Sequence, residues 1–234
     1  MAILNARAGT LGLKIVYVGA GMSGKTTNLI HLHKTLPPDR RGPLTRLAGD
    51  GGDRTLFFDF MAFELGTVAG LKTHFHLYTV PGQAELQATR RAVLRGADAL
   101  VVVVDSDPRR MLENRQALTD VDAALQSLVQ DQATIPRVYQ FNKRDLADAL
   151  PLTMLDRELN PARWPGYPAR AIEGEGVKDC LQVIFKLAIA HIGRARQPQP
   201  ADRPRSPLAG PGRPPSKPSP VTPVGRPQWT DSPA

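Results

Sequence analysis

Residues 13 to 27 read LKIVYVGAGMSGKTT, and this stretch decides the fold. Its first part, Leu13 to Val18, is a β-branched run that predicts a strand, and the run stops at Gly19. Lys25 to Leu36 then has the apolar spacing of a helix, which Pro37 ends. Between the two elements lies the pattern G-x-x-x-x-G-K-[S/T]. A strand, a glycine-rich loop and a helix in this order predict a phosphate-binding site.

The glycines of this loop allow the backbone to wrap closely around phosphate oxygens, and the helix start adds unpaired N–H groups and positive potential. We expect Lys25 to neutralise the β- and γ-phosphates during catalysis and the Thr26 hydroxyl to bind Mg²⁺. The predicted nucleotide cradle consists of Gly19, Gly21, Met22, Ser23, Gly24, Lys25, Thr26 and Thr27. The alternative is a chance glycine-rich turn. The loop by itself does not choose between kinases, ATPases and GTPases.

The chain up to about Ile192 alternates short apolar runs with helical stretches. Further strands are predicted at 55–60, 73–80, 99–104, 137–141 and 167–172, and further helices at 85–95, 107–130 and 177–192. The run Ala99 to Val104 is almost wholly apolar, as expected of a strand covered on both faces. This alternation predicts an α/β fold with a mostly parallel sheet between two layers of helices. Ligands of such sheets bind beyond the C-terminal ends of the strands.

A second motif, NKRD at Asn142 to Asp145, directly follows the strand predicted at Arg137 to Phe141. Guanine presents two adjacent N–H donors that a fixed carboxylate such as Asp145 accepts, and adenine has no such pair. Asn142 is expected to serve the N7/O6 edge, while the stem of Lys143 packs along the ring. Four residues alone are explained as well by a charged surface turn. In this position after the phosphate loop, however, the motif predicts guanine as the base.

Two longer strings accompany these motifs, DRTLFFDF at Asp53 to Phe60 and TVPGQ at Thr79 to Gln83. With them the chain, over about Lys14 to Ile192, resembles the MglA family of bacterial Ras-like small GTPases. The resemblance implies a P-loop NTPase fold of the Ras-like kind and a GTP/GDP switch that uses Mg²⁺ and hydrolyses GTP to GDP and phosphate. It also implies polarity or motility effectors, and an MglB-like GTPase-activating partner of the Roadblock fold.

The same resemblance assigns roles to individual residues. Thr55 would join the Mg²⁺ shell, and Gly82 would contact the γ-phosphate. Gln83 would orient the attacking water, and Arg54 would act as an arginine finger supplied by the enzyme itself. Thr79 stands where the wider Ras pattern has an aspartate that holds Mg²⁺ through water. Either Mg²⁺ affinity is lower, or another carboxylate such as that of Asp59 helps.

The composition predicts one Ras-like domain, residues 1–195, followed by a basic tail, residues 196–234. Twelve of the 22 prolines fall between Pro198 and Pro233. Because this stretch has scarcely any large apolar residues, it cannot bury enough surface to offset the entropy of ordering, and we expect it to be disordered. Residues 197–234 of this tail carry +3 of the net charge of +8, and the remaining +5 is spread thinly over the rest of the chain. We therefore expect no nucleic-acid partner.

The sequence encodes no recognisable membrane anchor. No apolar stretch approaches the ~20 residues that span a bilayer. Residue 2 is Ala rather than Gly, and the chain does not end in a Cys-containing lipidation box. We therefore expect a cytoplasmic protein without an integral membrane segment, whose recruitment to cell poles would depend on partners.

Other functions of a P-loop protein remain open at this stage. One alternative is a GTP-binding interaction scaffold with little turnover, against which Gln83 and Arg54 argue. Another is a small-molecule kinase, which needs an arginine-bearing lid and an acceptor pocket that the segments after Ala99 do not supply. In the helix after Gln83, Arg90 and its neighbours Arg91 and Arg95 form either a docking patch or a solvated face.

Overall fold

The computed structural model describes residues 3–5, 8–47, 58–68, 70–80, 87–128 and 135–195. All of them belong to one compact unit, Met1–Gln197. The tail predicted at 196–234 lies outside the described residues, and so do the segments 48–57 and 81–86. The domain boundary at residue 195 therefore stays a prediction.

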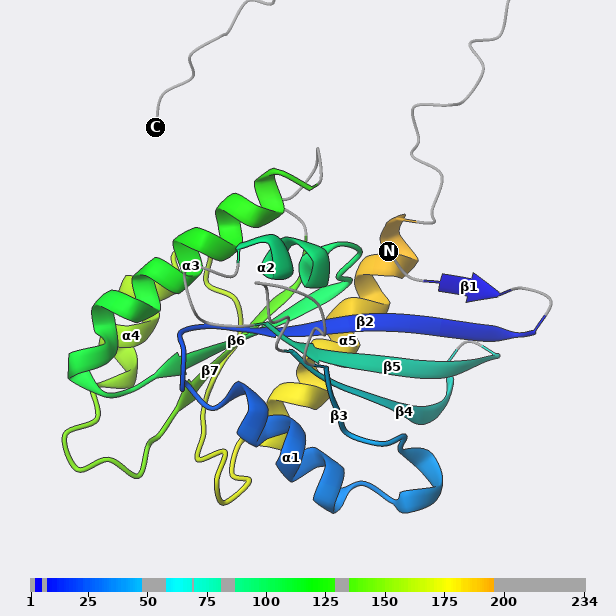
Figure 1. Ribbon diagram of the computed structural model, residues 1–234, viewed down its shortest axis with the longest axis horizontal. Helices are drawn as coiled ribbons and strands as arrows, with labels where there is room; N and C mark the ends of the chain where they lie inside the picture. The colour runs from blue at the N-terminus through cyan, green and yellow to red at the C-terminus, as the bar shows by residue number, and fades with distance from the viewer. Residues whose placement is uncertain are drawn as a thin grey trace, which may run out of the picture. The chain divides into compact units, whose positions relative to one another are not determined.

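A mixed sheet organises the described residues (Figure 1). Its strands are β1 (Ile3–Asn5), β2 (Thr10–Val18), β3 (Thr45–Leu47), β4 (Phe58–Val68), β5 (Leu71–Thr79), β6 (Ala99–Asp105), β7 (Arg137–Asn142) and β8 (Gly166–Pro168). Their order is β3-β4-β5-β2-β6-β7-β8, and β1 pairs with β2 outside this path. β5, β2, β6, β7 and β8 run parallel, whereas β4 is antiparallel to both β3 and β5. The predicted parallel sheet is thus extended by an antiparallel edge.

Helices cover both faces of this sheet. They are α1 (Lys25–Thr35), α2 (Gln87–Leu94), α3 (Met111–Gln126), α4 (Leu152–Leu159) and α5 (Val177–Ala195), with short 3-10 helices η1 (Pro38–Arg40) and η3 (Pro108–Arg110). β6 shows why two layers form, because all its side chains are buried and point alternately to opposite faces. Val101 and Val103 pack in the core under α1 and α5, while Val102 and Val104 pack in the core under α2, α3 and α4.

Most of the predicted elements are confirmed with shifted ends, and three need correction. The last predicted strand, 167–172, is wrong beyond Pro168 because the backbone N–H of Ala171 is held by the Asn142 side chain instead of a neighbouring strand. The helix predicted from Asp107 is divided into η3 and α3, with the Asp107 carboxylate accepting the N–H of Arg109. The strand predicted at 55–60 is described only from Phe58 and extends to Val68. α4 was not predicted.

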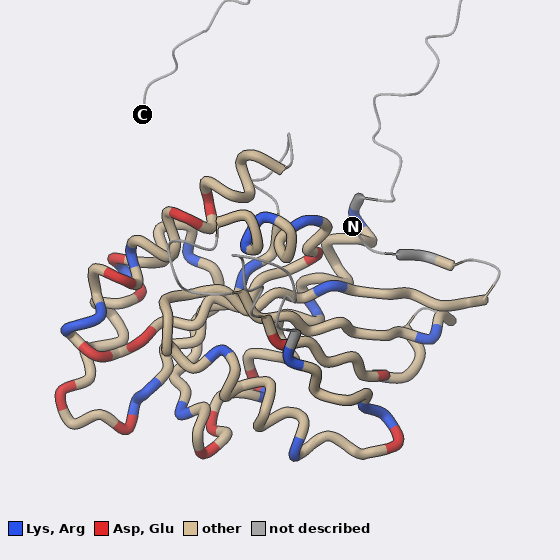
Figure 2. The backbone as a smooth tube through the Cα atoms, in the orientation of Figure 1, with Lys and Arg blue, Asp and Glu red and all other residues tan. Residues whose placement is uncertain are grey.

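Charged residues of both signs are interspersed over the described backbone, as along α3 and α4 (Figure 2). This distribution agrees with the expectation that the net positive charge is spread thinly. Within the described residues, no helix combines the length and apolar content that a membrane crossing demands.

Candidate nucleotide-binding site

The phosphate loop connects β2 to α1 and packs against the ends of two other strands. Gly19 and Gly24 both have positive φ, +137° and +106°. A Cβ at Gly19 would lie 2.1 Å from the carbonyl oxygen of Val103 in β6, and one at Gly24 would lie 2.2 Å from Nδ2 of Asn142. Both glycines are therefore needed for conformation and for close approach.

Lys25 is the cation of this loop, and its side chain is almost fully buried. Its ammonium donates to the carbonyl oxygens of Gly19 at 3.0 Å and Ala20 at 2.6 Å. Burial, with a smaller contribution from the positive charge of Arg90, lowers the pKa of Lys25 to about 8, and the Asp59 carboxylate acts in the opposite direction. A buried ammonium whose bonds go to backbone carbonyls is well prepared to pair with an anionic phosphate.

A cluster of oxygen atoms lies beside the start of α1. The Thr26 hydroxyl donates to Oδ2 of Asp59 at 2.5 Å, and the Thr79 hydroxyl donates to the same oxygen at 3.2 Å. The Thr79 hydroxyl also accepts the Asp59 N–H at 2.9 Å. Arg46 lies 3.2 Å from the other carboxylate oxygen. Two hydroxyls and a buried carboxylate form the hard, oxygen-only donor set that suits Mg²⁺.

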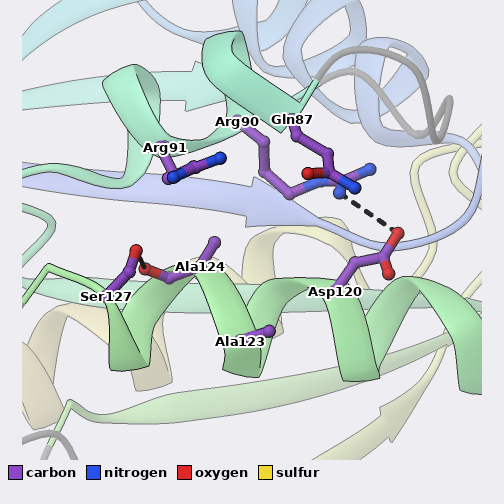
Figure 3. Close-up of a pocket in the computed structure, with 7 residues that line it drawn as sticks. All are labelled: Gln87, Arg90, Arg91, Asp120, Ala123, Ala124 and Ser127. Atoms are coloured by element: carbon purple, nitrogen blue, oxygen red, sulfur yellow. Dashed lines mark hydrogen bonds and ion pairs between the residues drawn. The ribbon is translucent and has the colours of Figure 1, made fainter.

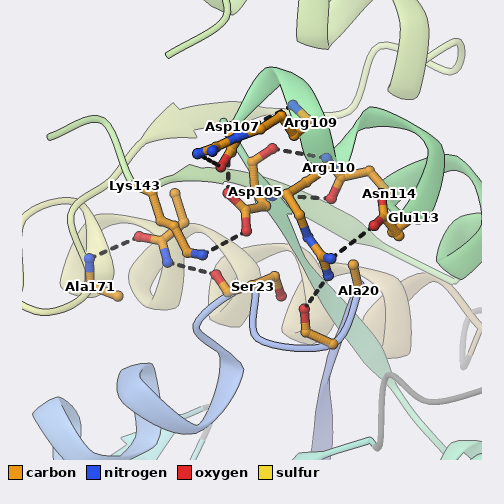
Figure 4. Close-up of polar contacts among 12 residues, drawn as sticks. Ala20, Ser23, Asp105, Asp107, Arg109, Arg110, Glu113, Asn114, Lys143 and Ala171 are labelled. Atoms are coloured by element: carbon orange, nitrogen blue, oxygen red, sulfur yellow. Dashed lines mark hydrogen bonds and ion pairs between the residues drawn. The ribbon is translucent and has the colours of Figure 1, made fainter. Parts of the chain in front are cut away.

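The base loop is joined to the phosphate loop through one side chain, that of Asn142 at the end of β7. Its Nδ2 donates to the carbonyl oxygen of Ser23 at 2.7 Å, and its Oδ1 accepts the N–H of Ala171 at 2.9 Å (Figure 4). The amide thus binds three loops together. The contact of Asn142 with the N7/O6 edge of guanine stays a prediction.

Lys143 is held by a residue that the sequence reasoning missed, Asp105. Its ammonium lies 2.7 Å from Oδ2 of Asp105, which is completely buried at the end of β6. Asn114 in α3 bonds both the N–H and the carbonyl of Asp105, at 3.1 and 2.8 Å. The sequence did contain a signal for Asp105, an aspartate at the carboxyl end of the apolar strand VVVVD, because ligands bind at that edge of a parallel sheet. Asp145, the predicted partner of the guanine donors, is exposed at the same edge.

A cavity of about 250 Å³ lies between α2 and α3 (Figure 3). Its lining is Gln87, Arg90, Arg91, Asp120, Ala123, Ala124 and Ser127. Arg90 forms an ion pair with Asp120 at 3.1 Å, and its side chain is 4% exposed. The solvated helix face that the sequence left open is therefore wrong for Arg90, which lies inside the helix interface.

Four residues with predicted roles lie outside the described residues. They are Arg54 and Thr55 in the segment before β4, and Gly82 and Gln83 in the segment after β5. Their roles in hydrolysis and in Mg²⁺ binding stay predictions.

Comparison with known proteins agrees with this geometry. A sequence profile of the ADP-ribosylation factor (Arf) family matches residues 55–187. The mutual gliding-motility protein MglA of Myxococcus xanthus (strain DK1622) is 40% identical over 192 residues, which cover 82% of this chain and 98% of that protein.

Proposed function

We propose how the residues of this chain divide the work of a GTPase cycle, because the chain belongs to the Arf family of Ras-like small GTPases and is similar to the gliding-motility protein MglA. The chain is a GTP/GDP molecular switch that hydrolyses GTP to GDP and phosphate. The main support for this proposal is the 2.7 Å hydrogen bond from the Asn142 side chain to the carbonyl oxygen of Ser23. It holds the base loop and the phosphate loop at one spacing, so that one ligand reaches both.

The base end of the site recognises guanine. Asp145 accepts the paired N–H donors of the base, and Lys143 packs along the ring. The ion pair of Lys143 with buried Asp105 supports this role, because it fixes the lysine before the nucleotide arrives. The phosphates lie along the backbone N–H groups of Gly21 to Thr27, with Lys25 as their counter-charge.

The phosphate end of the site holds Mg²⁺ through Thr26 and Thr55. When bound, the ion neutralises charge on the transferring phosphoryl group. The Thr26 hydroxyl gives its hydrogen to Asp59, which leaves its oxygen lone pairs available to the cation. Asp59 thus supplies the carboxylate that is missing at Thr79. Arg46 balances its charge from the exposed side.

Hydrolysis requires two further groups from the segments next to β4 and β5. We assign Gln83 to orient the attacking water and Arg54 to stabilise the charge of the transition state. Gly82 contacts the γ-phosphate, so that its segment changes with the nucleotide. This set of groups argues against a scaffold with little turnover.

The name of the Myxococcus relative ties that protein to gliding motility. For this chain we propose the same kind of output, cell polarity or motility, with a Roadblock-fold activating protein of the MglB kind as partner. We propose that it works in the cytoplasm and reaches cell poles through partners. We also propose that residues 1–195 form the GTPase domain and that residues 196–234 are a disordered tail.

The test is nucleotide binding with fluorescent GDP, GTP and ATP analogues in Mg²⁺, on the full chain and on Lys25→Ala and Asp145→Asn. The proposed roles of Lys25 and Asp145 are supported if the full chain binds GDP and GTP tightly and both variants lose this binding. Equal binding of ATP contradicts the base site. Single-turnover hydrolysis then compares the full chain with Gln83→Leu, and equal rates would favour the scaffold.

A further inference from the structure

An arginine outside both nucleotide motifs touches the phosphate loop. Arg110 ends the 3-10 helix η3, and its Nη2 donates to the carbonyl oxygen of Gly21 at 2.9 Å (Figure 4). Its Nη1 lies 2.8 Å from Glu113, one turn further along α3. One guanidinium nitrogen thus pairs with Glu113 of α3, and the other binds the phosphate loop.

The peptide that Arg110 holds is followed by a strained residue. Among the described residues, three non-glycine residues have positive φ, namely Met22 at +61°, Lys143 and Arg163. A non-glycine residue rarely adopts this region, because its Cβ crowds the backbone. Met22 is 88% exposed, so packing of its side chain does little to offset the strain.

A trans peptide fixes where the N–H of Met22 points. The carbonyl of Gly21 and the N–H of Met22 belong to one planar unit and project to opposite sides. While Arg110 holds the carbonyl, that N–H is kept pointing in the opposite direction, away from Arg110. Without this bond, rotation of the peptide would relieve the strain at Met22 and would turn the N–H as well.

We propose that Arg110 is a positioning residue that holds the Gly21–Met22 peptide so that the Met22 N–H faces the phosphates of the bound nucleotide. This inference rests on the proposed placement of the phosphates at Gly21 to Thr27. It separates Arg110 from the arginine finger assigned to Arg54, since Arg110 acts through the backbone and does not touch the nucleotide.

The test is GDP affinity of the full chain measured with a fluorescent GDP analogue in Mg²⁺. Arg110→Ala is expected to weaken binding roughly tenfold, the loss typical of a charged hydrogen-bond donor. Arg109→Ala is the matched control, because the neighbouring Arg109 is exposed and pairs with Asp107 instead of the loop. It is expected to bind GDP like the unaltered chain. Arg110→Lys, whose ammonium also donates, is expected to restore part of the affinity.

A double-mutant cycle with Met22→Gly separates positioning from a general structural effect. Glycine adopts positive φ without strain, so nothing drives the peptide to rotate once Arg110 is removed. In the Met22→Gly background, Arg110→Ala is therefore expected to cost threefold or less. If Arg110 only stabilised η3 and α3, its removal would cost the same in both backgrounds. If Arg110→Ala does not fold, Arg110→Lys takes its place in the cycle.

Two outcomes overturn the inference alone. They are an equal loss in both backgrounds, and an Arg110→Ala affinity within twofold of that of Arg109→Ala. A full chain that fails to bind GDP overturns the nucleotide site together with this inference.

Discussion

The base end and the phosphate end of the site are built in different ways. At the base end, Asn142 bonds to the backbone of Ser23 and Ala171, and Asp105 bonds to Asn114 in α3, so these side chains tie separate segments of the fold together. At the phosphate end, Lys25 bonds to its own loop, and Thr26, Asp59 and Thr79 bond to one another. The first end is a preformed frame. The second consists of polar groups that we expect to gain phosphate and Mg²⁺ as additional partners.

This difference indicates where specificity and switching reside. A base end held by these bonds disfavours the wrong base, because its polar groups would be left without partners. A phosphate end whose groups gain partners from the ligand responds to the number of phosphates and to the ion. Variants at the two ends are therefore expected to differ in kind as well as in size.

The largest effect is expected where the phosphate loop meets the fixed sheet. Gly19→Ala would place a Cβ 2.1 Å from the Val103 carbonyl at a φ of +137°. Since the backbone of β6 cannot yield, we expect the free energy of unfolding to fall by about 3 kcal/mol or more. Denaturant unfolding measures it. Gly193→Ala in α5 is the control, because its Cβ would meet nothing within 4 Å. Equal stability of the two variants would contradict the close approach.

The second effect tests the frame at the base end. Asn142→Ala leaves the Ser23 carbonyl and the Ala171 N–H without their partner, so we expect GDP affinity to fall by about 2 kcal/mol, roughly thirtyfold. Asn160→Ala is matched to it, because Asn160 is also buried and bonds Asp156 and Trp164 instead of the phosphate loop. That variant should lose stability but keep its affinity. If both variants bound GDP equally well, the frame would not govern recognition.

The third effect tests the contribution of Asp59 to Mg²⁺ binding at the phosphate end. Asp59→Asn keeps the shape of the side chain and removes its charge. We expect the Mg²⁺ concentration for half-maximal GDP binding to rise about tenfold, with affinity in chelator nearly unchanged. Asp98→Asn provides a control, since this buried carboxylate accepts the N–H of Lys14 instead. An unchanged Mg²⁺ requirement in Asp59→Asn would exclude Asp59 from the ion's surroundings.

The smallest effect concerns pH. Because the pKa of Lys25 is about 8, this ammonium is charged below pH 8 both before and after GDP binds, and affinity should be flat there. Above pH 8 the free protein loses that proton and must regain it to bind, so affinity should fall, about fourfold by pH 8.5. Calorimetry in two buffers of different ionisation enthalpy would detect the proton uptake. The uptake should be present at pH 8.5 and nearly absent at pH 6.5, and equal uptake at the two pH values would assign the proton to another group.

The sequence reasoning succeeded where a signal is local. The phosphate loop follows β2 and starts α1 as its spacing predicts, and the apolar run of β6 is buried on both faces. It did not identify α4, nor the end of β8 at Pro168, where the Asn142 side chain takes the backbone N–H that a strand would use. The sequence also could not show that Arg90 is buried, because its ion-pair partner, Asp120, lies in another helix.

By itself, the sequence determined the two loops and the α/β alternation, because glycine, proline and β-branched residues limit the backbone over a few neighbours. Only the tertiary structure decided that Asn142 meets Ser23, that Arg110 meets Gly21 and that Asp59 meets Thr26, at separations of 119, 89 and 33 residues. The order of strands in the sheet sets which ends lie side by side. Side-chain bonds between those ends therefore depend on the whole fold.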